Sequence, residues 1–569
     1  MLVRQRLILR CRVIKDQVLS NTLRNIIARG NIVTGIYFFF ENYLDRPKNC
    51  NYNFSHQMRM PRPVKNEFLD LVRTGTILPL SAEIDVPRLT PVAAFEALRA
   101  YCYPVLLEST RLDEKNGRYS FVTADPYLIF KSRGDDVELR LPTTPAGKYG
   151  QRASMKKKPL MKLRELMNNY RTCHVAGLPP FTGGAIGFFS YDFAYQLENL
   201  PRRAHVDLEI PESYIIFSDM VVAFDHAQNR VWVIVNPGAR EQKLGFQYPA
   251  AERWSRLYDE AVLRLTSVMS KLETPGRRVI PVDPARKTVS LHPRLVPDLA
   301  QAEFASMISR CKKYIADGDI RQANLSLRFS AMSSEWDPFL LYEILRDSNP
   351  SPYAVFLDFG DLQIVSSSSE HLVRLREGIV NSRLLTRWRS QDSNDREAIK
   401  QSGELQTNRA EHAGHNMLLE VQQSELDHIC NSKGTVADKI ILYKDHNPII
   451  EIISDVHGTL EQRKDCLDLV RAVFPGGIVT GVPKVRCMEI IDELEPTARG
   501  PYAGSMGYIS NSGNMDFNIG VSTFIFKGNV AYFQAGTTVT ADCDSNRSYS
   551  EILQDAEIFK TAWEKSYRA

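Results

Sequence analysis

The sequence predicts an α+β fold, in which strands and helices are mixed within one large body. Segments that alternate apolar and polar residues, as half-buried strands do, recur along the chain. Segments with apolar residues at helical spacing lie between them. The composition, 43% hydrophobic and 24% charged over 569 residues, is that of an ordinary globular protein. Many strands combined with several helices fit the α+β class.

The first lobe is expected to span residues 61–274. Residues 103–110 and 118–132 alternate apolar and polar side chains and predict strands, and 230–237 predicts another strand that ends at an Asn-Pro pair. Residues 251–272 have helical spacing.

A proline-rich connection, residues 275–299, follows this lobe, because prolines 275, 281, 284, 293 and 297 disfavour a helix or a central strand. The second lobe is expected at 300–565. Its predicted helices are 301–316, 408–421 and 548–563, and its predicted strands include 353–360, 362–368 and 530–536.

Residues 1–60 are set apart from the fold. Residues 1–30 contain seven basic residues and one acid, with Leu and Ile between them, which resembles an organelle transit peptide. Transit peptides are usually rich in serine, and serine is scarce here. An unstructured extension is therefore the alternative. We therefore expect a cytoplasmic protein, or an organellar one if residues 1–60 act as a transit peptide.

Charge and cysteine content exclude several classes of function. The net charge of +4 gives no reason to expect nucleic-acid binding or attraction to membranes. The longest apolar stretch, near residues 31–40, is too short to span a bilayer. The nine cysteines are dispersed without a CxxC or Cys/His ligand pattern, which favours reduced thiols and no structural zinc.

A glycine-rich stretch, residues 474–508, is the first candidate for chemistry. Thr480 can cap a helix that begins near Pro483, with a buried stripe of Val485, Met488 and Ile491. A helix N-terminus with Lys484 in its first turn suits an anion such as a carboxylate. A glycine-rich turn with a surface lysine is the alternative, and spacing alone does not decide between them.

Two glutamates form the second candidate. Glu411 and Glu551 lie in predicted helices far apart in the chain and could share a Mg²⁺, which prefers oxygen ligands. Taken alone, each is more typical of a solvated helix residue. His412 and His415 beside Glu411 lack the spacing of a metalloprotease helix.

These motifs resemble the chorismate-binding enzymes, the large subunits of anthranilate synthase and aminodeoxychorismate synthase. The matching segments are 106–109 and 182–201, then 317–330, 349–375, 474–496, 499–510, 513–519 and 532–536. The resemblance implies two facing sheets around a central cleft with helices outside. It also implies binding of chorismate with Mg²⁺, and ammonia supplied by a separate glutamine amidotransferase subunit.

The resemblance carries specific residues over to this chain. Substrate binding would involve Thr480, Gly481, Lys484, Tyr502, Gly504 and Gly536. The metal ligands would be Glu411 and Glu551; an ungapped alignment of "HNMLLEV" instead places Gly414 at the first ligand position. A pocket that binds tryptophan in the family would involve Leu106, Glu108, Ser109, Asn349, Pro352 and Tyr353, although the "LLES" segment is equally compatible with an ordinary core strand.

Several catalytic positions depart from the family. Thr386 stands where aminodeoxychorismate synthases carry a lysine nucleophile and anthranilate synthases an alanine, so the branch stays open; "QANLSLRF" and "MDFNI" favour aminodeoxychorismate synthase. Glu451 stands at the family histidine. Further substitutions are Arg387, Trp388, Ser522, Thr537 and Ser548.

Three hypotheses follow: a chorismate-aminating subunit of the aminodeoxychorismate type in folate synthesis, an anthranilate synthase subunit in tryptophan synthesis, or a catalytically inactive relative that binds tryptophan or a partner protein. Losing a general acid–base histidine costs about 10²–10⁴ in rate, which supports the third hypothesis.

Overall fold

The computed structural model describes residues 60–568 with gaps. The gaps are 73–76, 87, 112–116, 143–148, 171, 173–174, 242–250, 274–293, 334–335, 390–408, 432–436 and 444–448. Side chains at 387–389 and 409–412, among others, also lie outside the described set. The predicted extension at 1–60 and most of the connection at 275–299 therefore lie outside the described residues.

The first sheet is antiparallel throughout and combines strands from both predicted lobes. Its order is β1 (Leu80–Ile84), β10 (Arg230–Val235), β9 (Met220–Asp225), β3 (Tyr119–Thr123), β2 (Val105–Glu108), β13 (Tyr353–Asp358), β14 (Leu362–Ser368), β22 (Thr523–Lys527), β23 (Val530–Val539), β12 (Gln322–Met332) and β11 (Val296–Pro297), with β19 (Gly481–Val482) also paired to β12. The pairing of β2 with β13 joins the two lobes.

The second sheet is also antiparallel and mixed in the same way. Its order is β17 (Ala437–Tyr443), β18 (Ile449–Thr459), β16 (Ile379–Arg389), β15 (His371–Arg376), β21 (Met515–Asn518), β20 (Ser505–Ser510), β7 (Gly184–Phe189), β8 (Ser213–Ser218), β4 (Leu128–Arg133), β5 (Asp136–Pro142) and β6 (Tyr149–Lys156). Here the lobes join where β20 pairs with β7.

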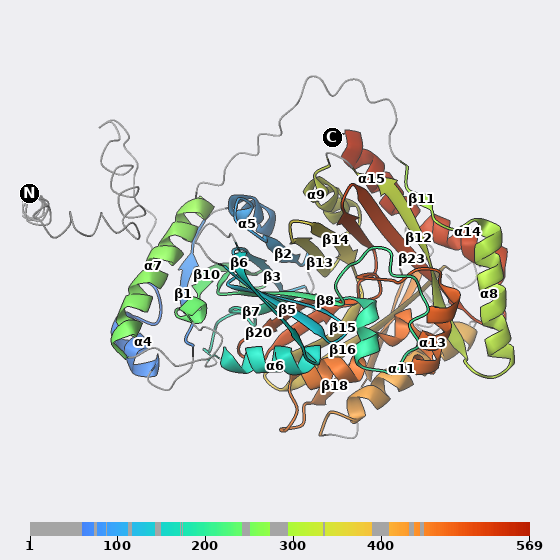
Figure 1. Ribbon diagram of the computed structural model, residues 1–569, viewed down its shortest axis with the longest axis horizontal. Helices are drawn as coiled ribbons and strands as arrows, with labels where there is room; N and C mark the ends of the chain where they lie inside the picture. The colour runs from blue at the N-terminus through green and yellow to red at the C-terminus, as the bar shows by residue number, and fades with distance from the viewer. Residues whose placement is uncertain are drawn as a thin grey trace, which may run out of the picture. The chain divides into compact units, whose positions relative to one another are not determined.

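Helices cover the outer faces of the sheets (Figure 1). The first sheet is contacted by α5 (Pro91–Leu98), α7 (Ala251–Glu273), α8 (Gln301–Ala316), α9 (Pro338–Ser348), α13 (Lys484–Leu494) and α14 (Ser545–Asp555). The second is contacted by α11 (Arg409–Asp427) and α12 (Cys466–Val473). The other described helices are α4 (Lys65–Val72), α6 (Pro159–Asn169) and α15 (Glu557–Arg568), with 3₁₀ turns η1 (Tyr191–Gln196), η2 (Ala239–Glu241) and η4 (Gly477–Val479).

An apolar core fills the space between the two sheets. Val105 and Val355 from the first sheet share one buried cluster with Ile186, Phe188 and Met506 from the second. Side chains alternate along a strand, so each sheet sends one set inward and the other toward the helices. The predicted α+β class, with two facing sheets and helices outside, is confirmed.

The structure differs from the sequence prediction in three local features. Residues 118–132 form two strands in different sheets, because the chain turns at Asp125, whose φ is +56°. The predicted helix 548–563 is two helices that meet at Ala556. In α13, Val485 is exposed, whereas Met488 and Ile491 are buried as expected.

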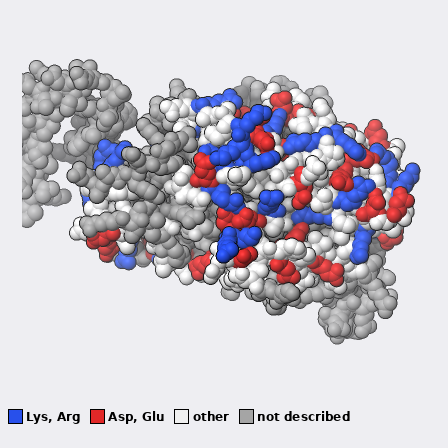
Figure 2. All heavy atoms as spheres, turned by 60° about the horizontal axis from the view of Figure 1, so that its bottom comes forward, with Lys and Arg blue, Asp and Glu red and all other residues white. Residues whose placement is uncertain are grey.

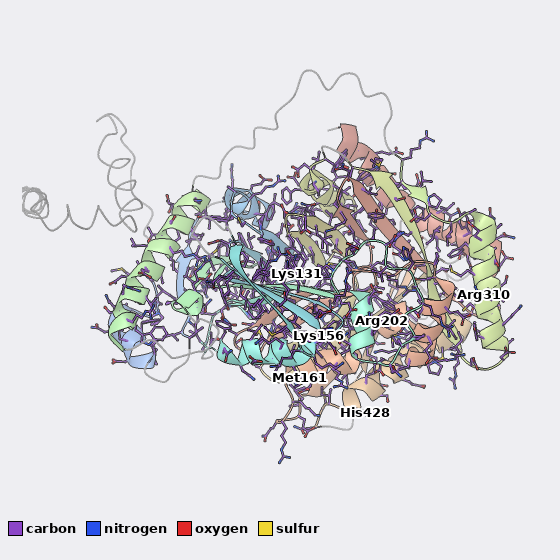
Figure 3. The ribbon with its side chains drawn as sticks, viewed as in Figure 1. Lys131, Lys156, Met161, Arg202, Arg310 and His428 are labelled. Carbon is purple, nitrogen blue, oxygen red and sulfur yellow. The ribbon has the colours of Figure 1, made fainter. Side chains whose placement is uncertain are left out.

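Charged side chains of both signs are interspersed over the face seen in Figure 2. Several tie outer helices to the body: Arg310 of α8 (Figure 3) lies 2.9 Å from Glu493 of α13. Among the described helices, none has the length and apolarity that crossing a membrane requires. Six cysteines in the described residues are free thiols.

Candidate functional site

Thr480, Asn324, Tyr502 and Gly536 meet beside the first sheet, and we call this group the Gly536 site. Strands β12 and β23 pair so that Gly536 lies opposite Ser326. A Cβ atom at Gly536 would lie 2.5 Å from Asn324 Oδ1 and 2.5 Å from Tyr502 Oη, so no larger residue fits without displacing them. Asn324 Oδ1 is buried and accepts no hydrogen bond within the described residues. Two polar side-chain atoms therefore fill the space over the bare backbone of Gly536, and one of them, Asn324 Oδ1, has no hydrogen-bond partner among the described residues.

A buried ion pair between Arg499 and Glu495 packs against this site. Arg499 is almost fully buried and donates to Glu495, to the Val479 carbonyl at 2.7 Å and to the Asn324 carbonyl at 2.7 Å. Its guanidinium also lies 5.8 Å from the centre of the Tyr502 ring, and burial raises the pKa of that phenol. Arg499 thus fixes three parts of the site at once. Sequence reasoning did not single it out, although it stands in the matched segment 499–510.

Thr480 is completely buried, but it does not cap α13. Its hydroxyl lies 3.1 Å from the Gly476 carbonyl and 3.2 Å from the Gly477 carbonyl, and the residue at the helix N-terminus is Pro483. The Thr480 carbonyl accepts from the backbone N–H of Asn324 at 2.8 Å, and this bond attaches the turn to β12. The predicted cap is therefore wrong, because the hydroxyl closes the preceding 3₁₀ turn instead.

Gly481 and Gly504 are positions of close backbone approach. A Cβ at Gly481 would lie 2.2 Å from the Gln322 carbonyl, and its φ is +135°. A Cβ at Gly504 would lie 2.3 Å from the Phe189 carbonyl. Both glycines are thus explained by strand packing.

Lys484 is engaged within the protein. Its ammonium lies 2.6 Å from Glu425 Oε1 on α11 and 3.0 Å from the Val473 carbonyl at the end of α12. Burial raises the pKa of Glu425, and the neighbouring Lys484 opposes that effect. The Lys484 ammonium predicted to receive an anion is therefore already paired with a carboxylate of the chain itself.

Thr386, His415 and Ser454 form a hydrogen-bonded network between the second sheet and α11. His415 is 1% exposed, with Nδ1 2.8 Å from Thr386 Oγ1 and Nε2 2.8 Å from Ser454 Oγ. Glu451 is also 1% exposed, but it pairs with Arg387 whereas Thr386 pairs with Ile452. Directly opposed residues share a face, so Thr386 and Glu451 lie on opposite faces of the sheet.

A small cavity of about 30 Å³ lies between β16, α11 and η4. Much of its wall is apolar: Leu384, Leu385, Leu418, Ile478 and Ile519. At the other substituted positions, Ser522 adopts a left-handed φ of +52°, and the Ser548 hydroxyl donates to the Asp544 carbonyl at 2.9 Å. The resemblance implies an arginine at position 522 and a glutamate at position 548, and neither serine carries such a charge.

The predicted metal ligands are described only in part. Glu551 is 45% exposed and forms an ion pair with Arg547 at 2.8 Å on α14. The side chain of Glu411 lies outside the described residues. Across the described residues, no group of three or more His, Cys, Asp or Glu side chains is placed to hold a metal ion.

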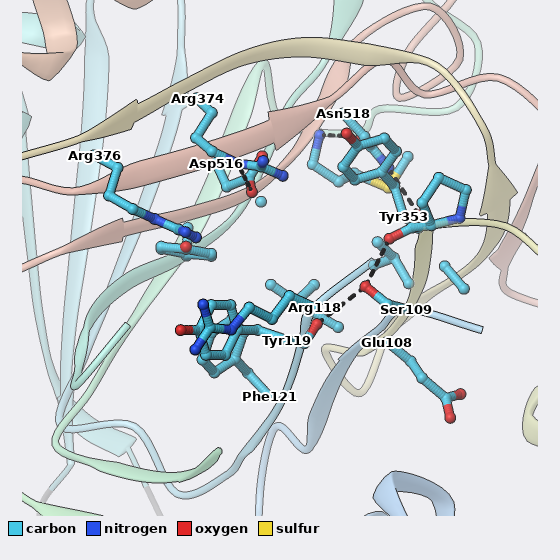
Figure 4. A pocket seen from close by; sticks show the side chains of 17 residues that line it. Glu108, Ser109, Arg118, Tyr119, Phe121, Tyr353, Arg374, Arg376, Asp516 and Asn518 are labelled. Atoms are coloured by element: carbon cyan, nitrogen blue, oxygen red, sulfur yellow. Dashed lines mark hydrogen bonds and ion pairs between the residues drawn. The ribbon is translucent and has the colours of Figure 1, made fainter. Parts of the chain in front are cut away.

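A second pocket lies between the two sheets, and we call it the inter-sheet pocket (Figure 4). It encloses about 60 Å³ and is lined from β2, β3 and β13 on one side and from β15, β20 and β21 on the other. Four of the six residues predicted for a tryptophan pocket line it: Glu108, Ser109, Pro352 and Tyr353.

The other two residues predicted for that pocket have structural roles. Leu106 is fully buried in the core on the helix side of its strand, and its neighbour Leu107 lines the pocket instead. Asn349 ends α9 and donates to Ser367 Oγ at 3.0 Å. Ser109 fixes the pocket wall, because its hydroxyl lies 3.0 Å from the carbonyls of both Tyr119 and Pro352.

Comparison with known proteins identifies relatives over most of the chain. Residues 109–561 match the family model described as chorismate binding enzyme. The chain is 30% identical to anthranilate synthase component 1 of Acetivibrio thermocellus, covering 89% of this chain and 99% of that protein. It is 32% identical to aminodeoxychorismate synthase component 1 of Bacillus subtilis, covering 81% and 92%. The crystal structure of anthranilate synthase component I from Streptococcus pneumoniae superposes with a TM-score of 0.63 at 27% identity, covering 79% and 93%.

Proposed function

The chain belongs to the chorismate binding enzyme family, and on that premise we propose that it is the large subunit of a chorismate-aminating synthase of the aminodeoxychorismate type. In this proposal, chorismate binds at the Gly536 site and ammonia comes from a separate glutamine amidotransferase subunit. The relatives carry the names of both branches, and an anthranilate synthase subunit is the alternative within the family.

One observation carries the proposal: the buried Asn324 Oδ1, beside Gly536 and Tyr502, has no hydrogen-bond partner among the described residues. Asn324 Oδ1 and the Tyr502 hydroxyl converge above Gly536, and the Arg499–Glu495 pair holds the surrounding backbone in place. Groups that are already oriented bind a ligand without a further entropic cost of ordering. Tyr502 would donate to an oxygen of chorismate.

The described residues support the binding of chorismate more strongly than they support its amination. Replacement of a ring hydroxyl requires a group that protonates the leaving oxygen. His415 is the buried imidazole nearest to Thr386, but both of its nitrogens are engaged by hydroxyl groups. Magnesium would supply charge neutralisation to such a reaction through the predicted ligands Glu411 and Glu551, and Glu551 is paired with Arg547. We therefore expect slow amination.

The experiment that tests this function uses the purified full chain with chorismate, Mg²⁺ and ammonium. Chromatography separates aminodeoxychorismate from anthranilate, whose fluorescence identifies it. We expect slow formation of aminodeoxychorismate, and anthranilate would assign the other branch. No product above the uncatalysed background would refute the catalytic proposal.

A matched pair of variants tests the site itself. Tyr502→Phe removes the hydroxyl over Gly536, and we expect about 10- to 100-fold weaker chorismate binding, equivalent to about 1.5–3 kcal/mol for a hydrogen bond to a charged group. Tyr532→Phe is the control. Tyr532 lies on β23, the strand of Gly536, but its ring packs against Arg328.

A second candidate function is a family member that binds an aromatic ligand, such as tryptophan, in the inter-sheet pocket without turnover. It is favoured by the use of Lys484 and Glu551 in ion pairs within the chain. Calorimetry with an aromatic ligand tests it independently of the chorismate assay.

A further inference from the structure

We propose that the inter-sheet pocket takes an aromatic acid, a ring with a carboxylate and no ammonium group, and that Arg376 binds this carboxylate. The inference rests on the second candidate function, that the pocket holds an aromatic ligand, and it specifies the chemical class of that ligand.

The inner wall of the pocket is suited to a flat ring. Phe121 and Tyr508 line it, with ring centres 5.3 Å apart and planes at 70°. Leu107, Val355 and Met506 complete the apolar part of the lining. An edge-to-face aromatic pair presents both a ring face and a ring edge to a third aromatic group.

The carboxylate of Glu108 is already neutralised. It accepts from the Tyr342 hydroxyl at 2.6 Å and from Arg346 Nε at 3.0 Å, and the residue is 3% exposed. Figure 4 shows this carboxylate directed away from the other labelled side chains of the pocket. An ammonium group in the pocket would therefore not meet a free Glu108.

The carboxylate of Asp516 is neutralised as well. Arg374 Nε donates to it at 2.7 Å, and His371 Nε2 lies 3.1 Å away. Burial alone would raise the pKa of Asp516, but Arg374 and His371 lower it to about 2. These are the only two carboxylates among the described residues that line the pocket, so neither is left for an ammonium group.

The arginines that line the pocket, unlike its two carboxylates, are not all paired within the described residues. Three arginines line the pocket: Arg118, Arg374 and Arg376. Arg118 donates twice to Asp225, at 2.6 and 3.0 Å, and Arg374 is paired with Asp516. Arg376 forms no ion pair with any described residue, and its buried Nε has no hydrogen-bond partner there. One guanidinium is therefore available for an anion.

Arg376 is also held where a ring-bound carboxylate can reach it. Its guanidinium lies 5.3 Å from the centre of the Tyr119 ring, and Tyr119 stacks on Phe121 with centres 6.1 Å apart. The guanidinium plane can bind a carboxylate through two parallel N–H groups. The aromatic slot and the unpaired cation thus lie side by side.

Three indole compounds that differ only in charged groups test the ligand class by calorimetry on the full chain: indole-3-propionate, L-tryptophan and tryptamine. We expect indole-3-propionate to bind at least 10-fold more tightly than tryptophan, and tryptamine to give no measurable heat. Equal or tighter binding of tryptophan would overturn the ligand class while leaving the pocket as a binding site. No heat from any of the three would overturn both. The chorismate assay reports separately on catalysis.

Variants locate the carboxylate site. Arg376→Gln should weaken indole-3-propionate at least 10-fold, and Arg376→Lys should restore part of the affinity because it keeps the charge. Arg133→Gln is the control, because Arg133 lies on β4 outside the pocket and donates to the Ile210 carbonyl. Unchanged affinity in Arg376→Gln, with an unfolding temperature equal to that of the control, would overturn the role of Arg376.

Discussion

The ion pair between Lys484 and Glu425 provides a direct test of whether this lysine acts in structure or in substrate binding. It joins the first turn of α13 to α11, and the ammonium also donates to the carbonyl of Val473, the last residue of α12. The two side chains are 14% and 17% exposed. Lys484→Met removes the charge and leaves Glu425 facing an apolar neighbour.

The expected loss follows from this burial. Removing one partner of a fully buried pair costs about 3–5 kcal/mol, and the partial exposure here lowers the expectation to about 2–4 kcal/mol. Replacing both residues, as in Lys484→Met with Glu425→Leu, leaves no unpaired charge and should cost less than the single change. The double-mutant cycle should therefore show a coupling free energy above about 1.5 kcal/mol.

The loss should also depend on pH. Burial raises the pKa of Glu425 above its unfolded value, so its stabilising contribution is present at low pH and is lost as the pH rises through the folded pKa. Without Lys484 that pKa rises further. Lys484→Met should thus be most destabilising near pH 8 and less so near pH 5, where a protonated Glu425 needs no counter-charge.

Urea unfolding followed by circular dichroism measures these differences at both pH values, with chorismate binding measured on the same samples. A loss below about 0.5 kcal/mol at pH 8, together with abolished chorismate binding, would refute the structural role and return Lys484 to the substrate site.

Three further outcomes are expected. Gly536→Ala should abolish chorismate binding, because the new Cβ displaces the Asn324 and Tyr502 side chains; retained affinity would remove the Gly536 site as the binding position. Asp516 has its pKa lowered to about 2, so it stabilises the protein by about 2 kcal/mol above pH 4 and loses this as the pH falls toward 2. Asp516→Asn should remove that part of the acid sensitivity in thermal unfolding, and an unchanged pH profile would contradict the assignment. If Mg²⁺ binds at Glu551, it must displace Arg547, so Arg547→Ala should strengthen Mg²⁺ binding in calorimetry and Glu551→Gln should remove it; no change in either variant excludes the site.

Period-two and helical spacing predicted several of the strands and helices, because burial of one face is a local property of the sequence. Helix 301–316 and strand 362–368 have the predicted bounds. Residues 118–132 were predicted as one strand, because alternation continues across Asp125, and nothing in the period indicates that the chain changes sheets there. That change depends on long-range pairing with β9 on one side and β8 on the other.

The site could be predicted only where a motif kept its residues in sequence order. Thr480 and Tyr502 were identified in this way. The Tyr502 hydroxyl lies over Gly536, whereas Thr480 reaches the site only through its carbonyl, which accepts from the Asn324 backbone N–H. The partner of Lys484 lies 59 residues away on another helix, and sequence spacing gives no register between two helices. Arg376 was missed for a related reason, because an unpaired arginine is recognised only after every neighbouring carboxylate has been assigned its partner.

Titration of the full chain with chorismate by calorimetry, for the unaltered protein and for Tyr502→Phe, tests most directly whether the recognition site has been kept. We predict saturable binding of chorismate. Loss of the Tyr502 hydroxyl should weaken this binding about 10- to 100-fold, and Tyr532→Phe should leave it unchanged. Absence of binding at millimolar chorismate, or equal affinity in all three proteins, would contradict it.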